Sequence, residues 1–217
     1  MRRRAIEIAH QSSETWGRLS AARALGLRQA LAAGWGNPLL LDAHKVCAAF
    51  LPEAVPDDFA QLKIPLTLIA TDLRARSEVA FTTGDLKTAV AASMALPGLL
   101  LPVESAGRVL VDGAAVNPLP FDHLAGKADL VVAVDPSGSP IDAHGVPNPL
   151  ETMFATLQVM SDTILAFKLA RGAPDLVIRP KVGVFRLLDF LRASAILRAA
   201  DAVKAEAKER LGAMLNA

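Results

Sequence analysis

The residues best suited to chemistry are Asp112, Gly113 and Ala114, which directly follow the apolar run at positions 108–111. An aspartate placed after a buried strand lies at the strand's carboxyl end, where open α/β sheets carry their sites. The glycine lets the chain reverse tightly, with no side chain beside the carboxylate. Such a carboxylate can accept a proton from a nucleophile. Taken alone, however, the tripeptide favours an ordinary strand-to-turn connection.

A nucleophile for that carboxylate is not evident in the sequence. A hydrolase elbow has the pattern Gly-x-Ser-x-Gly, which holds the serine on a sharp strand-to-helix turn. None of the ten serines has a glycine two residues before it and another two residues after it. Ser93 lies among alanines in a predicted helix, where close helix packing explains it better than nucleophilicity.

The remaining polar candidates favour structural roles. The four histidines are dispersed and lack a ligand spacing such as His-Glu-x-x-His, so we expect no metal site and no cofactor. They are His10, His44, His123 and His144. The single cysteine, Cys47, excludes an internal disulfide, and its apolar neighbours predict a buried, inert thiol. Asp72 and Asp135 each end a predicted strand near the same sheet edge, and strand-end capping explains them most economically.

The composition limits the function classes. Lys and Arg total 23 against 22 acidic residues, for a net charge of +1, so we expect no nucleic-acid partner. Hydrophobic residues make up 52% of the chain, enough for a packed core. The longest charge-free stretch, 88–103, is broken by prolines and predicts no membrane span. We expect a cytoplasmic protein with, at most, peripheral contact with the inner membrane.

The elements that would position Asp112 alternate along the chain. Helices are predicted at about 2–31, 42–50, 86–96, 149–171 and 193–211, and strands at 65–72, 78–82, 108–111, 129–135 and 176–179. This alternation predicts an α/β class with a largely parallel or mixed sheet. We expect a single partial domain over residues 1–217, with a core of about 1–135, a loop at 136–148, and C-terminal helices and a short strand at 149–217.

Several stretches, taken in order, resemble the second half of the patatin-like phospholipase family, especially its bacterial branch related to neuropathy target esterase. They lie at positions 69–73, 91–103, 109–120, 128–135 and 175–180. Several motifs at the expected spacing are more specific than any one of them. The resemblance implies a three-layer patatin-like α/β fold, from which the N-terminal strands and the nucleophile elbow are missing here.

The resemblance also implies a chemistry. In that family a serine in a Gly-x-Ser-x-Gly elbow attacks the ester carbonyl, and an aspartate in an Asp-Gly-Gly or Asp-Gly-Ala motif is its only partner. Asp112 would be that base, with Gly113 and Ala114 as motif support. The substrate would be a lipid or acyl ester, and the serine–aspartate dyad needs no cofactor. Because the serine and the glycine-rich oxyanion loop are absent, we expect the chain as written to be inactive.

Two explanations for the missing serine stay open. The chain is either a fragment of a lipid acyl hydrolase or a non-catalytic lipid-binding or interaction remnant of the same fold. We favour the fragment, because Asp112 and its setting are retained. A sheet without its nucleophile strand would expose an edge, so self-association is a further expectation, as is transient contact with a membrane surface.

Overall fold

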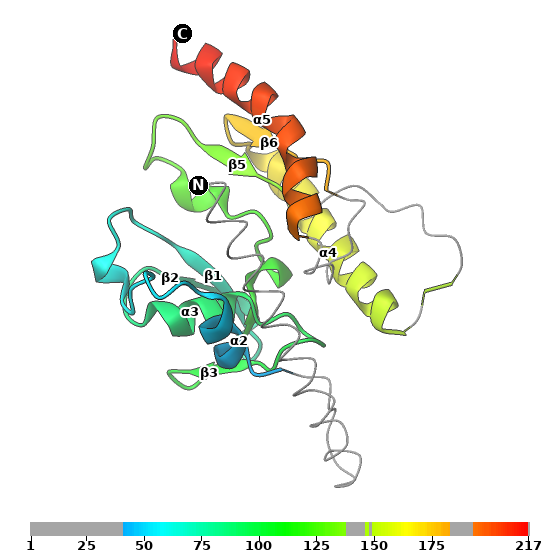
Figure 1. Cartoon of the computed structure of the whole chain (residues 1–217). Helices are drawn as coiled ribbons and strands as arrows, with labels where there is room; N and C mark the ends of the chain where they lie inside the picture. Colours follow the sequence, from blue (N-terminus) through cyan, green and yellow to red (C-terminus); the bar gives the residue numbers. More distant parts are fainter. Residues whose placement is uncertain (1–40, 138–145, 148, 183–192, 217) are drawn as a thin grey trace, which may run out of the picture. The chain divides into compact units, whose positions relative to one another are not determined.

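The protein is described by a computed structural model covering residues 41–137, 146–147, 149–182 and 193–216. The chain falls into two compact units, Met1–Asn117 and Pro118–Ala217 (Figure 1). The predicted helix at 2–31, most of the predicted loop at 136–148, and His10 and His144 lie outside the described residues.

The first unit contains a four-stranded sheet in the order β2-β1-β4-β3, with every neighbouring pair antiparallel. The strands are β1 (Leu68–Asp72), β2 (Ser77–Phe81), β3 (Val103–Ser105) and β4 (Arg108–Asp112). The sequence predicts a largely parallel or mixed sheet: this sheet by itself is antiparallel, and the mixed alternative holds once the parallel pair of the second unit is included. The connections explain the difference, because β1–β2 and β3–β4 are joined by short turns, whereas parallel neighbours need a crossover of a dozen residues or more.

Two helices of the first unit begin at aspartates. Asp42 accepts a hydrogen bond from the Lys45 amide at the start of α2 (Ala43–Phe50), as the sequence predicts. Asp85 caps α3 (Leu86–Ser93) in the same way through the Thr88 amide. A capping side chain satisfies one of the amides that a helix start leaves unpaired. A short 3₁₀ turn, η1 (Phe59–Gln61), precedes β1.

The core of the first unit lies between these helices and the sheet. Three alanines on and just after α3 are fully buried, namely Ala91, Ala92 and Ala95, and they pack with Ala70 of β1 and Leu110 of β4. Such small side chains let the helix backbone approach the strands closely, and the contact buries apolar area from both. Cys47 is also buried here, and burial raises the pKa of its thiol, as expected for an inert cysteine.

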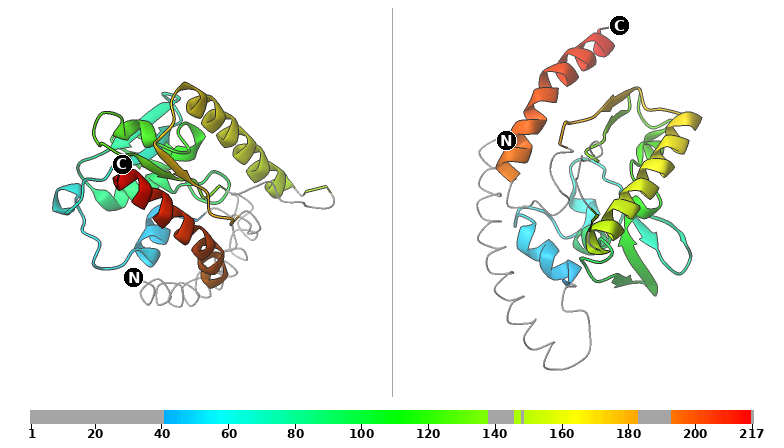
Figure 2. Two further views of the ribbon diagram at one scale, coloured as in Figure 1. Left: turned by 90° about the horizontal axis from the view of Figure 1, so that it is seen from above. Right: turned by 90° about the vertical axis from the view of Figure 1, so that its right-hand side faces the viewer.

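The second unit contains a parallel pair, β5 (Val132–Val134) and β6 (Leu176–Ile178), which makes the described strands mixed overall. Two long helices accompany it, α4 (Pro149–Arg171) and α5 (Ala193–Leu215), and α4 is one uninterrupted helix (Figure 2). A 3₁₀ turn, η3, covers Phe121–Leu124. Leu165 of α4 packs with Leu119 and with Ala133 of β5.

Much of α4 is exposed. Its side chains Val159, Met160 and Phe167 are 64%, 56% and 69% exposed. By length and composition alone, Glu151–Arg171 could cross a membrane, whereas the sequence predicted a helix here but no membrane span. Asp162 lies near the middle of the segment, where a charge is costly in a bilayer.

The close packing of α3 against the sheet can be tested by placing a larger side chain between them. Ala92→Leu should lower the free energy of unfolding by about 1–3 kcal/mol, because no space is left beside this fully buried alanine. Ala80→Leu, at an exposed position of β2, is the matched control and should change it by less than about 0.5 kcal/mol. Urea unfolding followed by circular dichroism measures both, and equal effects would contradict the packing described.

Candidate active site around Asp112

Asp112 is the last residue of β4, and the structure holds its backbone at two points. Its amide donates to the carbonyl of Ala95 at 3.1 Å, just beyond α3. Its carbonyl accepts a hydrogen bond from Oγ1 of Thr71, on β1, at 2.8 Å. The aspartate is thus tied to a helix end and to the neighbouring strand, neither of which is close to it in sequence.

The turn after Asp112 is closed by local hydrogen bonds. Oδ1 of Asp112 accepts from the Ala114 amide at 2.8 Å and caps the 3₁₀ turn η2 (Gly113–Ala115). The amides of Val116 and Asn117 donate to the carbonyl of Gly113 at 3.1 and 2.9 Å. The bond from the Ala114 amide fixes the position of Oδ1. Because the carboxylate is planar, it also fixes the direction in which Oδ2 points.

The second oxygen, Oδ2, is the chemically open one. Across the part of the chain that the structure describes, no hydrogen bond or ion pair to Oδ2 is found. In the same residues no fully buried side-chain oxygen lacks a partner, so Oδ2 must reach the surface. An oriented carboxylate with one accessible oxygen can accept a proton from a hydroxyl group placed beside it.

Gly113 is required by space rather than by backbone conformation. A Cβ atom at this position would lie 2.3 Å from the carbonyl oxygen of Ile69 and 2.8 Å from its carbon. Both are backbone atoms of β1 and cannot move aside. Gly113 is not among the described residues with positive φ, so the lack of space beside β1, rather than a special backbone conformation for tight reversal, explains the glycine.

The electrostatics of Asp112 suit a base. Burial raises the pKa of its carboxyl group above the ordinary value, and the hydrogen bond from the Ala114 amide partly opposes this. A raised pKa makes the carboxylate a better proton acceptor than a fully solvated one.

Two further polar side chains near the turn are buried. Thr71 is 5% exposed and Asn117 is 6% exposed, and Nδ2 of Asn117 donates to Oε2 of Glu78 at 2.7 Å. The sequence places Asn117 within the stretch at 109–120 that resembles the family, but it did not identify Thr71 or Glu78. The available signal was a polar threonine within the apolar run of β1.

The other aspartates singled out in the sequence lie elsewhere. Asp72 ends β1 and accepts from the amides of Arg74 and Ala75 at 2.9 and 3.1 Å, which confirms strand-end capping. However, β1 and β4 are antiparallel, so their carboxyl ends point in opposite directions along the sheet. The expectation that Asp72 and Asp135 lie near one sheet edge is wrong, because Asp135 follows β5, in the other sheet.

Asp135 connects the two strands of the second unit. It is 7% exposed, accepts from Nε of Arg179 at 3.1 Å, and accepts from both the amide and the hydroxyl of Ser137. Burial alone would raise the pKa of Asp135, but the hydrogen bonds from Ser137 and the Arg179 charge together hold it below its usual range. A carboxylate engaged in this way has a structural role.

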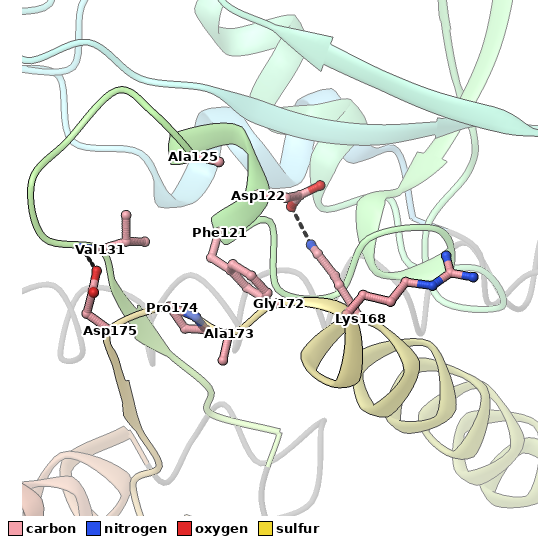
Figure 3. Close-up of a pocket in the computed structure, with 10 residues that line it drawn as sticks. Phe121, Asp122, Ala125, Val131, Lys168, Gly172, Ala173, Pro174 and Asp175 are labelled. Carbon is pink, nitrogen blue, oxygen red and sulfur yellow. Dashed lines mark hydrogen bonds and ion pairs between the residues drawn. The ribbon is translucent and has the colours of Figure 1, made fainter.

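The second unit also has a shallow pocket of about 370 Å³ beside the end of α4 (Figure 3). Its central cation, Lys168, is already engaged: the ammonium group donates to the carbonyl of Leu119, pairs with Asp122, and lies 4.6 Å from the centre of the Phe121 ring. The charge of Lys168 therefore serves to join α4 to η3.

No group of three or more potential metal ligands occurs among the described residues.

The family model of patatin-like phospholipases matches residues 8–125, more than half of the chain, so this protein belongs to the patatin-like phospholipase family. The matched segment includes α2, α3, the whole antiparallel sheet and the Asp112 turn. Family membership supports a lipid hydrolase-type function.

The relatives belong to the NTE family. Uncharacterized NTE family proteins of Mycobacterium bovis and Mycobacterium tuberculosis are 44% identical over 101 residues, which is 46% of this chain and 28% of each relative. A further uncharacterized NTE family protein of Mycobacterium tuberculosis is 27% identical over 154 residues, covering 60% of this chain and 26% of the relative. The chain therefore spans about a quarter of the length of these relatives.

The contact of Gly113 with β1 leads to a direct test. Gly113→Ala should lower the free energy of unfolding by at least about 2 kcal/mol, because the added Cβ meets backbone atoms. Gly172→Ala is the control, since a Cβ there meets nothing within 4 Å. Chemical denaturation measures both variants, and a fully stable Gly113→Ala protein would mean that the turn does not lie against β1.

The raised pKa of Asp112 has a consequence for stability. The pKa of this carboxyl group is higher in the folded state than in the unfolded chain. At a pH below the unfolded-state pKa, its contribution to the stability of the fold is fully present. That contribution is lost as the pH rises through the folded-state pKa, because the folded protein must then carry a buried charge. Near neutral pH the charged, buried group is therefore a cost. Asp112→Asn keeps an acceptor for the Ala114 amide and should raise Tm by a few degrees near pH 7.

The same comparison near pH 3 is the internal check, because both side chains are then uncharged and the difference in Tm should disappear. Asp42→Asn controls for the loss of one charge, since Asn is an equally good helix cap at that half-buried position. A lower Tm for Asp112→Asn near pH 7 would contradict the electrostatic description of the site.

Proposed function

We propose that this chain carries the aspartate half of a serine–aspartate lipid acyl hydrolase, with Asp112 as the proton acceptor. The observation that carries the proposal is the geometry of the carboxylate. Oδ1 is oriented by the Ala114 amide, and Oδ2 reaches the surface without a hydrogen bond in the described residues. A carboxylate of this kind, at the end of a strand in a patatin-like phospholipase, is suited to a serine hydroxyl.

The proposed reaction proceeds in two halves. The serine oxygen bonds to the acyl carbon of an ester while Oδ2 of Asp112 takes its proton, and that proton then passes to the oxygen of the departing alcohol. Water next attacks the acyl-serine ester and gives a proton to Asp112, which returns it to the serine as the fatty acid leaves. The aspartate thus acts first as base and then as acid in each half.

The nucleophile of this proposal is not among the 217 residues, since no Gly-x-Ser-x-Gly pattern occurs in them. We propose that it is supplied by polypeptide beyond these residues. Removing one member of a catalytic unit abolishes most of its rate enhancement, so the isolated chain should turn over acyl esters at a background rate only.

Activity should depend on Asp112 once a serine segment is present. The test uses a protein in which a Gly-x-Ser-x-Gly segment accompanies these residues, encoded upstream of Met1 or grafted from an active family member. Asp112→Asn should then lower kcat for a p-nitrophenyl acyl ester roughly 10³–10⁴-fold, because the amide cannot accept the serine proton. The Ala114 amide keeps its acceptor, so the fold is retained.

Asp72→Asn is the matched control, because Asp72 caps a turn on the same sheet and takes no part in the proposed chemistry. It should leave kcat within a few-fold of the parent. Unchanged hydrolysis in Asp112→Asn would show that Asp112 is not the base.

A second candidate is a non-catalytic protein that binds lipid through the same fold, and the missing Gly-x-Ser-x-Gly pattern favours it. The intact mass of the protein from its native source separates the two. A mass above the 22.9 kDa of this chain favours the hydrolase, whereas a mass equal to it, with fatty-acid binding but no turnover, favours the binding protein.

A further inference from the structure

A hydrogen bond behind the Asp112 turn is not explained by packing alone. Nδ2 of Asn117 donates to Oε2 of Glu78 at 2.7 Å, across 39 residues of sequence. Asn117 is 6% exposed, and Glu78 is half-buried on β2. An apolar pair could fill this space without the cost of desolvating a carboxylate, so stability by itself is a poor reason for it.

The register of the sheet places this bond relative to Asp112. Glu78 lies directly opposite Thr71, and Thr71 lies directly opposite Val111, so the three side chains share one face of the sheet. Asp112 lies opposite Ala70, and its side chain therefore belongs to the other face. Glu78 and Thr71 therefore lie on the face of the sheet opposite to the Asp112 carboxylate.

From that face, the two side chains hold both ends of the turn. Thr71 donates to the carbonyl of Asp112, where the turn begins. Glu78 accepts from Asn117, where the turn ends. Between these points, the amides of Ala114, Val116 and Asn117 close the turn on itself. Together with the bond from the Asp112 amide to the carbonyl of Ala95, three long-range bonds and three local ones fix the backbone from which the carboxylate projects.

We propose that Asn117 and Glu78 form a clamp that positions the Asp112 turn against the sheet and so aims the open oxygen of Asp112. Both are positioning residues, since neither lies on the face of the carboxylate. The inference rests on the proposed function only for what Asp112 does with a proton. The clamp itself is a statement about the turn and can be tested without any catalytic activity.

The test compares four variants of the full chain by amide hydrogen exchange in NMR. Asn117→Ala and Glu78→Ala remove the clamp. Glu78→Gln retains an oxygen acceptor for Asn117 without the charge. Asp42→Ala removes a hydrogen bond of similar kind at the α2 cap and controls for general loss of stability. The reporters are the amides of Ala114 and Val116, and the paired amides of β1 and β2 are the internal reference.

We expect the Ala114 and Val116 amides to exchange about tenfold faster in Asn117→Ala and Glu78→Ala while the β1–β2 amides change little. Glu78→Gln and Asp42→Ala should both resemble the parent at the turn. Loosening should also let water reach Asp112, so its pKa, read from the carboxyl carbon shift, should fall toward the ordinary value in the two alanine variants.

Unchanged amide exchange at the turn in the alanine variants would overturn the clamp. Equal acceleration at the turn and in the β1–β2 amides would also overturn it, because the bond would then stabilise the whole unit and not the turn in particular. Should Asn117→Ala fail to fold, Glu78→Ala decides by the same comparison. In an active protein that includes this chain, the alanine variants should lower kcat with little change in KM. If Asp112→Asn were fully active while Asn117→Ala still loosened the turn, the proposed function would fail and the clamp would stand.

Discussion

The turn after β4 lies against the bare backbone of β1, and the site depends on that contact. Only a residue without a Cβ fits at Gly113, because the carbonyl of Ile69 occupies the place of a side chain. Close contact brings Asp112 beside Thr71 and lets the chain reverse within one short 3₁₀ turn. Burial follows from the same closeness and raises the pKa of the carboxyl group. The close contact between the turn and β1 therefore accounts both for the tight backbone turn and for the raised pKa of Asp112.

In the first unit, helix α3 also packs closely against the sheet. The buried alanines of α3 bring its C-terminal end near β4, and the carbonyl of Ala95 then accepts the amide of Asp112. A larger side chain on either side would move the helix end and, with it, the backbone of the aspartate. The core and the candidate site are thus built from the same small residues, which makes the position of Asp112 sensitive to changes far from it in sequence.

The patatin-like family accounts for the part of the molecule that contains this arrangement. Within it, Oδ1 of Asp112 accepts a hydrogen bond from the turn, and Oδ2 has no hydrogen bond among the described residues. The aspartates of the second unit differ in this respect. Asp135 uses its oxygens for Ser137 and Arg179, and its lowered pKa fits a structural anion better than a base.

The sequence by itself determined the local features: the caps at Asp42, the helix of α4, the strand that ends in Asp112, and the family resemblance. Each depends on neighbours within a few residues or on motif order, which a chain displays directly. Only the tertiary structure decided that the main sheet is antiparallel, that Gly113 meets Ile69, and that Glu78 reaches Asn117. The β1–β4 pairing and the last two contacts join residues about forty positions apart, and no periodicity or local propensity specifies which distant backbone a turn will touch.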